Sequence, residues 1–137
     1  MIVAPPLLSV KNLEVSFSAS GGNVQAVRNI SFSIDSGQTL AIVGESGCGK
    51  SVTVQSIMGL LPTPPAKIDA AEIKLMDQSI QHSHTINGKD IRGNAIGMIF
   101  QDPMTSLNPT MKIGHQVAET LIVHQKFSRK NAHNKAV

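Results

Sequence analysis

The chain has 137 residues, enough for one small domain with its own hydrophobic core. Its formal net charge of +3 is too small an excess to indicate nucleic acid as a partner, and a single cysteine excludes an internal disulfide. No apolar run approaches the length of a membrane span, and the first six residues lack the basic head and apolar stretch of a secretory signal. We therefore expect a cytoplasmic α/β protein that is rich in loops.

The first part of the chain has the pattern of half-buried strands. Apolar and polar residues alternate over residues 7–17, with an interruption at Asn12. After a turn that contains Gly21 and Gly22, a second alternating strand is expected at about residues 24–34. A short strand is also expected at residues 73–76, within a polar and weakly patterned stretch.

Two further segments are apolar at consecutive positions. Residues 39–43 and 95–100 have the pattern of strands that are covered on both faces in a parallel sheet. Apolar residues have helical spacing over residues 51–61, and the prolines from Pro62 onward end this helix. Helical spacing recurs from Ile113 into the basic C-terminal residues. Buried strands alternating with helices predict an α/β core.

The segment between the first of these strands and its helix matches the phosphate-binding pattern G-x-x-x-x-G-K-[ST]. Its residues are Gly44, Glu45, Ser46, Gly47, Cys48, Gly49, Lys50 and Ser51. Glycines permit turns in which successive N–H groups converge on phosphate oxygens, and the N-terminus of the following helix adds partial positive charge. Lys50 is expected to reach the β- and γ-phosphates of ATP, and the Ser51 hydroxyl to bind Mg²⁺.

A chance glycine turn is the alternative interpretation, because the pattern fixes only the positions of Gly44, Gly49, Lys50 and Ser51. The strand and helix patterns on either side favour the nucleotide site. Cys48 occupies a position that the pattern leaves free, and we expect it to be a passive filler, although a helix N-terminus can lower the pKa of a thiol.

The loop alone does not distinguish kinases, GTPases, helicases and transporters. Residues 97–109, GMIFQDPMTSLNP, together with residues 42–52 and 56–62, closely resemble the ATP-binding subunits of ABC transporters, above all the oligopeptide/dipeptide importer group. The resemblance covers nearly the whole chain and is weakest over residues 66–92, where Ala71 precedes Glu72 in place of the family's usual glycine. It implies a P-loop NTPase core with an N-terminal antiparallel β subdomain, so that residues 1–137 form the N-terminal part of a nucleotide-binding domain.

The resemblance also implies roles for residues outside the loop. Phe17 matches the position at which the family stacks an aromatic ring, usually tyrosine, on adenine; a core strand residue is an equal alternative. Gln101 matches the Q-loop glutamine, a Mg²⁺ ligand and sensor of the attacking water, and residues 102–109 would face membrane subunits. Asp102 is a rival Mg²⁺ ligand, as the carboxylate after a buried strand in an unrelated NTPase. The twelve-residue likeness around Gln101 favours the glutamine.

The 137 residues contain neither the family's Leu-Ser-Gly-Gly-Gln signature nor an Asp-Glu pair after an apolar strand. We therefore expect a chain that is truncated before the helical and signature half, with one sheet edge and one apolar face bare. Such a chain would cradle phosphates but would not hydrolyse ATP alone at a useful rate, because phosphoryl transfer depends on positioning and charge stabilisation.

As partners, the resemblance implies a second ATP-binding subunit, in a homo- or heterodimer, and membrane permease subunits, with a peripheral place on the cytoplasmic face of the membrane. The transported substrate stays open among peptides, nickel and glutathione. Two alternatives are a stand-alone small P-loop kinase or NTPase, and a remnant of a truncated gene without nucleotide function.

The histidines offer a weaker metal hypothesis. His82 and His84 could present both rings to one ion if they lay on a strand, but solvated loop histidines are the favoured interpretation. His115, His124 and His133 recur every nine residues, and we expect all of them at the surface.

Overall fold

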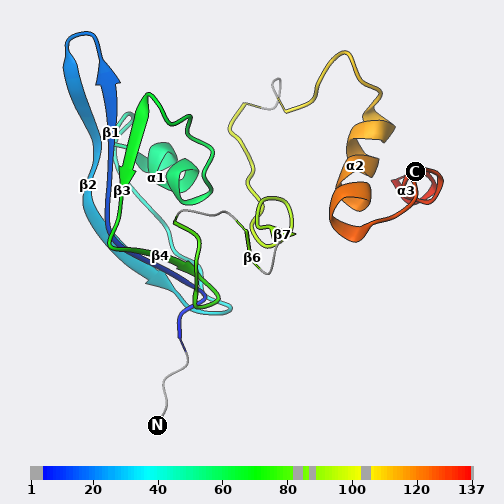
Figure 1. Ribbon diagram of the computed structural model, residues 1–137, viewed down its shortest axis with the longest axis horizontal. Helices are drawn as coiled ribbons and strands as arrows, with labels where there is room; N and C mark the ends of the chain where they lie inside the picture. Colours follow the sequence, from blue (N-terminus) through cyan, green and yellow to red (C-terminus); the bar gives the residue numbers. More distant parts are fainter. Residues whose placement is uncertain (1–4, 82–84, 87–88, 103–105, 137) are drawn as a thin grey trace. The chain divides into compact units, whose positions relative to one another are not determined.

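The computed structural model describes residues 5–81, 85–86, 89–102 and 106–136. The chain divides into two compact units, Met1–Lys89 and Asp90–Val137 (Figure 1). Each unit has its own buried residues.

The first unit is built on an antiparallel sheet. Strands β1 (Leu8–Ala19) and β2 (Gly22–Ile34) form a long hairpin that pairs from Leu8 opposite Ile34 to Ala19 opposite Gly22, with register shifts between Val10 and Ser16. The other edge of β1 pairs with β3 (Ala66–Asp69) and with β4 (Glu72–Leu75), and the short β5 (Gln78–Ser79) pairs with β4. The predicted N-terminal antiparallel sheet is therefore confirmed.

The interruption at Asn12 is an irregularity within one strand. Asn12 and Asn29 both have left-handed backbone angles, with φ of 51° and 48°, which asparagine tolerates better than most residues. The Asn12 side-chain Nδ2 donates to Asn29 Oδ1 at 2.7 Å, and the Asn12 backbone N–H donates to Ser31 Oγ at 2.8 Å. These bonds satisfy polar groups that the register shift removes from the ladder, and so β1 continues to Ala19.

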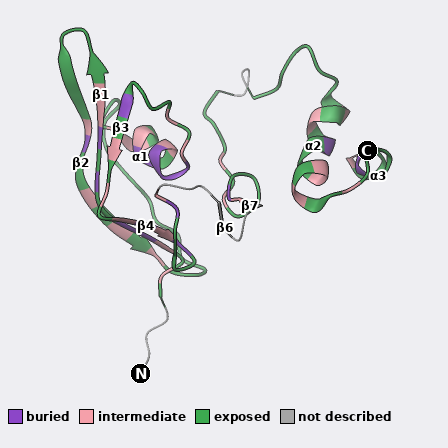
Figure 2. Cartoon of the chain, viewed as in Figure 1, coloured by how far each residue is buried: buried purple, intermediate pink, exposed green. Residues whose placement is uncertain are grey.

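The core of the first unit lies between the sheet and helix α1 (Lys50–Ile57) (Figure 2). Leu13 and Val15 of β1 are fully buried, as the alternating pattern predicts. The other buried apolar residues of this unit are Val10, Val27, Ile57, Met58, Ala66, Ile73, Leu75 and Ile80. Helix α1 ends at Ile57, earlier than its apolar spacing suggested, because Gly59 takes a left-handed angle of 64° just after it.

The two predicted buried strands are wrong for this structure. Residues 39–43 and 97–100 have no strand pairing, and Val43 and Ile99 are 91% and 98% exposed. The physical reason is that a strand covered on both faces needs neighbours on both edges, and no described strand pairs with either segment.

The second unit contains two helices. Helix α2 (Ile113–Gln125) begins where predicted, but it stops at Lys126, whose φ is 58°, and helix α3 (Arg129–Ala136) follows. The basic C-terminal residues therefore form a separate short helix. Before these helices the chain forms the two-residue strands β6 (Thr85–Ile86) and β7 (Lys89–Asp90), which pair with each other. None of the described helices is long and apolar enough to cross a membrane.

Candidate phosphate-binding site

The glycine loop lies directly before α1, as its sequence pattern predicts. Residues 44–48 are exposed, and the Cys48 N–H donates to the Glu45 carbonyl at 3.3 Å to close a tight turn. Gly47 and Gly49 have φ of 83° and 92°, a backbone conformation that side chains disfavour. The glycines therefore permit the turns of this loop.

Gly49 is also required by a contact with β2. A Cβ atom at Gly49 would lie 2.4 Å from the carbonyl oxygen of Ala26 and 3.5 Å from Cγ2 of Val27. Val27 is itself buried in the core. The absent side chain thus lets the loop lie against the backbone of a fixed strand.

The N-terminus of α1 is open to an anion. Gly49 is the N-cap residue and provides no side-chain cap, and the first turn contains no acidic residue. The first N–H groups of the helix and its partial positive charge are therefore available to phosphate oxygens. Thr53 strengthens this first turn, because its buried hydroxyl donates to the Gly49 carbonyl at 2.9 Å.

Lys50 carries the charge of the site. Its Nζ donates to the carbonyl oxygens of Gly44 at 2.8 Å and Glu45 at 2.6 Å, and it lies 3.5 Å from Cys48 Sγ. The ammonium group is therefore held over the loop by the loop's own backbone. A phosphate group with its three acceptor oxygens would meet this ammonium and the helix N-terminus together.

A hollow of about 500 Å³ lies between the loop and β2. Its walls are formed mainly by Val24, Ala26, Arg28, Ile42, Val43, Gly47 and Lys50. Two of its lining residues, Arg28 and Lys50, are cations, and no carboxylate lines it. Apolar walls with two cations among the lining residues are suited to a ligand that joins an apolar body to phosphate groups.

The structure places the loop of residues 44–51 beside β2. The other predicted site residues do not all line the hollow between them. Ser51 is exposed in the first turn of α1. Phe17 is half-buried on β1 opposite Val24; Val24 lines the hollow and Phe17 does not. Gln101 and its rival Asp102 are exposed residues of the second unit.

Sequence reasoning missed the contribution of β2. Val24, Ala26 and Arg28 carry no local motif, and their approach to the loop is a tertiary contact that only the folded chain reveals. No group of three or more His, Cys, Asp or Glu side chains among the described residues is placed to hold a metal ion. His82 and His84, for which solvated loop histidines are the favoured interpretation, lie outside the described residues.

The sequence of this chain is similar to a known protein family and to several characterised proteins. The ABC transporter family model matches residues 27–137. The oligopeptide transport ATP-binding protein OppD of Bacillus subtilis is 51% identical over 137 residues, which are 100% of this chain and 38% of that protein. The dipeptide transport ATP-binding protein DppD of the same organism is 54% identical over 126 residues, 92% of this chain and 38% of that protein. The glutathione import ATP-binding protein GsiA of Escherichia coli is 41% identical over 131 residues, 92% of this chain and 21% of that protein.

Proposed function

The chain belongs to the ABC transporter family, and we propose that it binds Mg-ATP at the loop of residues 44–51. The observation that carries this proposal is the joint presence of an uncapped helix N-terminus, the Lys50 ammonium and a hollow without carboxylates. Each of these features favours a polyphosphate over other ligands of the same size.

The residues of the loop have distinct tasks in this proposal. The N–H groups of residues 47–51 bind phosphate oxygens, and Lys50 moves from the loop carbonyls to the β- and γ-phosphates. The Ser51 hydroxyl, which is exposed in the first turn of α1, would be one oxygen ligand of Mg²⁺. Gln101, phosphate oxygens and water would be the other oxygen ligands of the ion.

Two further residues complete the proposed site. We assign Phe17 to stacking on the adenine ring, supported by its place opposite Val24, which lines the hollow. We assign Gln101 to contact with Mg²⁺ and the attacking water, supported by its place in the family's Q-loop pattern.

At the level of the whole protein, we propose the energising subunit of an importer for dipeptides or oligopeptides. The names of the OppD and DppD relatives support this cargo. The chain spans 38% of the length of these two relatives, and its own residues include no Asp-Glu pair. The proposed partners are membrane permease subunits and a second ATP-binding subunit, at the cytoplasmic face of the membrane. The 137 residues are expected to bind ATP without turning it over at a useful rate.

The test is a direct titration of the chain with ATP in the presence and absence of Mg²⁺. Lys50→Ala should abolish binding, whereas Lys67→Ala, which removes an exposed lysine that is paired with Asp69, should leave it unchanged. Equal binding by the wild type and K50A would contradict the proposal. ATP turnover that depends on Asp102 would instead support a stand-alone NTPase, and no binding by the wild type would support a remnant without nucleotide function.

A further inference from the structure

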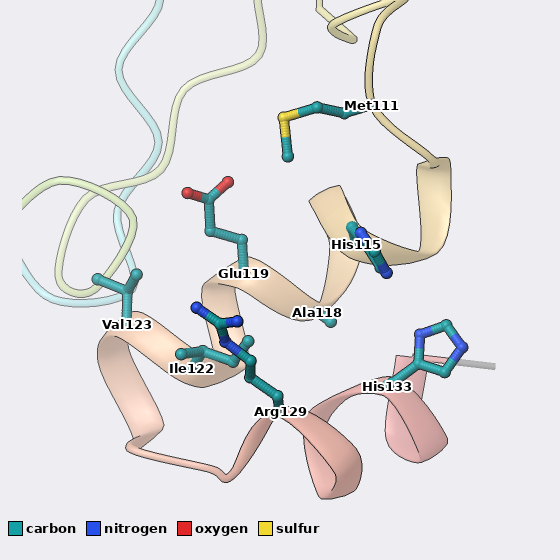
Figure 3. Close-up of a pocket in the computed structure, with 8 residues that line it drawn as sticks. All are labelled: Met111, His115, Ala118, Glu119, Ile122, Val123, Arg129 and His133. Carbon is teal, nitrogen blue, oxygen red and sulfur yellow. The ribbon is translucent and has the colours of Figure 1, made fainter.

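A second hollow, of about 430 Å³, lies between α2 and α3 in the second unit (Figure 3). Four of its lining residues, His115, Ala118, Glu119 and Ile122, recur on α2 at helical spacing and so share one face of that helix. Arg129 and His133, one turn apart, line it from α3. It therefore lies where two regular helix faces converge, and it is separate from the nucleotide loop of the first unit.

The walls of this hollow are held in place. Ala118 and Ala132 are 3% and 0% exposed, and their small side chains let the two helices approach closely. The rings of His115 and His133 meet edge to face, with centroids 5.9 Å apart. Met111, which lines the hollow before α2 begins, has its carbonyl fixed by Gln116 Nε2 at 3.0 Å. A preorganised wall lowers the ordering cost of binding.

Glu119 and Arg129 bring opposite charges to the rim of this hollow, and both residues are exposed. Among the described residues, neither Glu119 nor Arg129 takes part in an ion pair, with each other or with another side chain. Figure 3 shows both side chains extending away from their helices. A simple anion would be attracted by Arg129 and repelled by Glu119, and a simple cation would meet the reverse. A ligand that carries both charges satisfies both groups.

We propose that the α2–α3 hollow binds a small zwitterion with an ammonium and a carboxylate group, as in a free amino acid or a short peptide. The ligand carboxylate pairs with Arg129, its ammonium pairs with Glu119, and its apolar part lies on Ala118 and Ile122. The hollow's volume is within the range of small-ligand pockets, about 300–1,000 Å³. This site is independent of ATP binding.

The first test is a titration of the full chain at pH 7 with alanine and with alanyl-alanine. Binding is monitored by the amide chemical shifts of residues 111–136. We expect saturable binding with a Kd on the order of 1 mM, as suits a small ligand in an open site. N-acetylalanine and alaninamide each lack one charge and should bind at least about tenfold more weakly. Tighter binding of alanine than of alanyl-alanine would identify free amino acids as the ligand, and the reverse order would identify peptides. Equal binding of the single-charge analogues, or no saturable shift, would overturn the proposal.

The second test uses variants of the two charged residues. Glu119→Gln and Arg129→Gln should each weaken binding by at least about tenfold, while Lys130→Gln, on the same helix but outside the hollow, should not. The double exchange Glu119→Arg with Arg129→Glu should restore binding, because the zwitterion can reverse its orientation. Loss of binding in the double exchange with unchanged helical circular dichroism would contradict the proposal. Lys50→Ala should leave zwitterion binding intact, which separates this result from the fate of the nucleotide site.

Discussion

The side-chain amide of Gln116 holds the backbone of Asn108 from both sides. Its Oε1 accepts the Asn108 N–H at 2.9 Å, and its Nε2 donates to the Asn108 carbonyl at 2.9 Å. The same Nε2 donates to the Met111 carbonyl, and the Asn108 side chain accepts two further bonds from Thr110. One side chain of α2 thus fixes the backbone at the end of the predicted Q-loop segment, residues 102–109.

Replacement of Gln116 should loosen this segment without unfolding α2. In Gln116→Leu, amide hydrogen exchange at residues 108, 110 and 111 should become faster, because three hydrogen bonds to the backbone are lost. Gln116→Glu keeps the acceptor and loses the donor, and should give an intermediate rate. Gln125→Leu, an exposed glutamine at the end of α2, is the control. Unchanged exchange in Q116L would show that these bonds do not hold the segment.

Gly49→Ala should damage both stability and nucleotide binding. The new Cβ would lie 2.4 Å from the Ala26 carbonyl, and the φ of 92° is unfavourable for alanine. A destabilisation of at least about 1–3 kcal/mol is expected from the backbone conformation alone. Chemical denaturation and ATP titration would measure the two effects. Gly21→Ala is the matched control, because a Cβ there meets nothing within 4 Å; equal effects of the two variants would contradict the contact with Ala26.

Arg28 should contribute to the affinity for phosphate groups. It lines the same hollow as Lys50, and that hollow has no carboxylate. Arg28→Gln should weaken ATP binding about threefold to tenfold, and should weaken adenosine binding hardly at all, because only the charged groups of the ligand are affected. Arg129→Gln, in the second unit, is the control for loss of an exposed arginine. If R28Q weakened adenosine and ATP equally, the role of Arg28 would be packing and not charge.

Features that depend on residues adjacent in the sequence could be predicted. Features that depend on contacts between residues far apart in the sequence could not. The alternation of Leu13 and Val15 determines which face of β1 is buried, and the loop of residues 44–51 is fixed by adjacent glycines and the helix that follows. Val43 and Ile99 have the pattern of buried strands, yet a residue is buried only where other elements cover it. Helix α2 ends at Lys126, where neither glycine nor proline is present, and so the sequence did not predict this helix end.

The pH dependence of stability should contain a contribution from Glu72. Hydrogen bonds from Lys11, Ser9 and Lys74 lower the pKa of its carboxyl from 4.5 to about 2. Because the folded-state pKa is the lower one, this stabilisation is fully present above pH 4.5 and is lost as the pH falls towards 2. Denaturation curves of the wild type between pH 5 and pH 2 should therefore show a loss that Glu72→Gln lacks. Glu14→Gln, on the same sheet, should keep the wild-type dependence; a wild-type slope in E72Q would exclude Glu72 as its source.

Alkylation of Cys48 should report nucleotide binding without any need for turnover. Cys48 is the one cysteine of the chain, is exposed within the loop, and lies 3.5 Å from Lys50 Nζ. Phosphates bound to the surrounding N–H groups would cover its thiol, so ATP should slow the reaction with N-ethylmaleimide in proportion to occupancy. Protection should disappear in Lys50→Ala, while adenosine should protect much less than ATP because it lacks phosphates. An alkylation rate that ATP leaves unchanged at concentrations that saturate the titration would place the nucleotide away from residues 44–51.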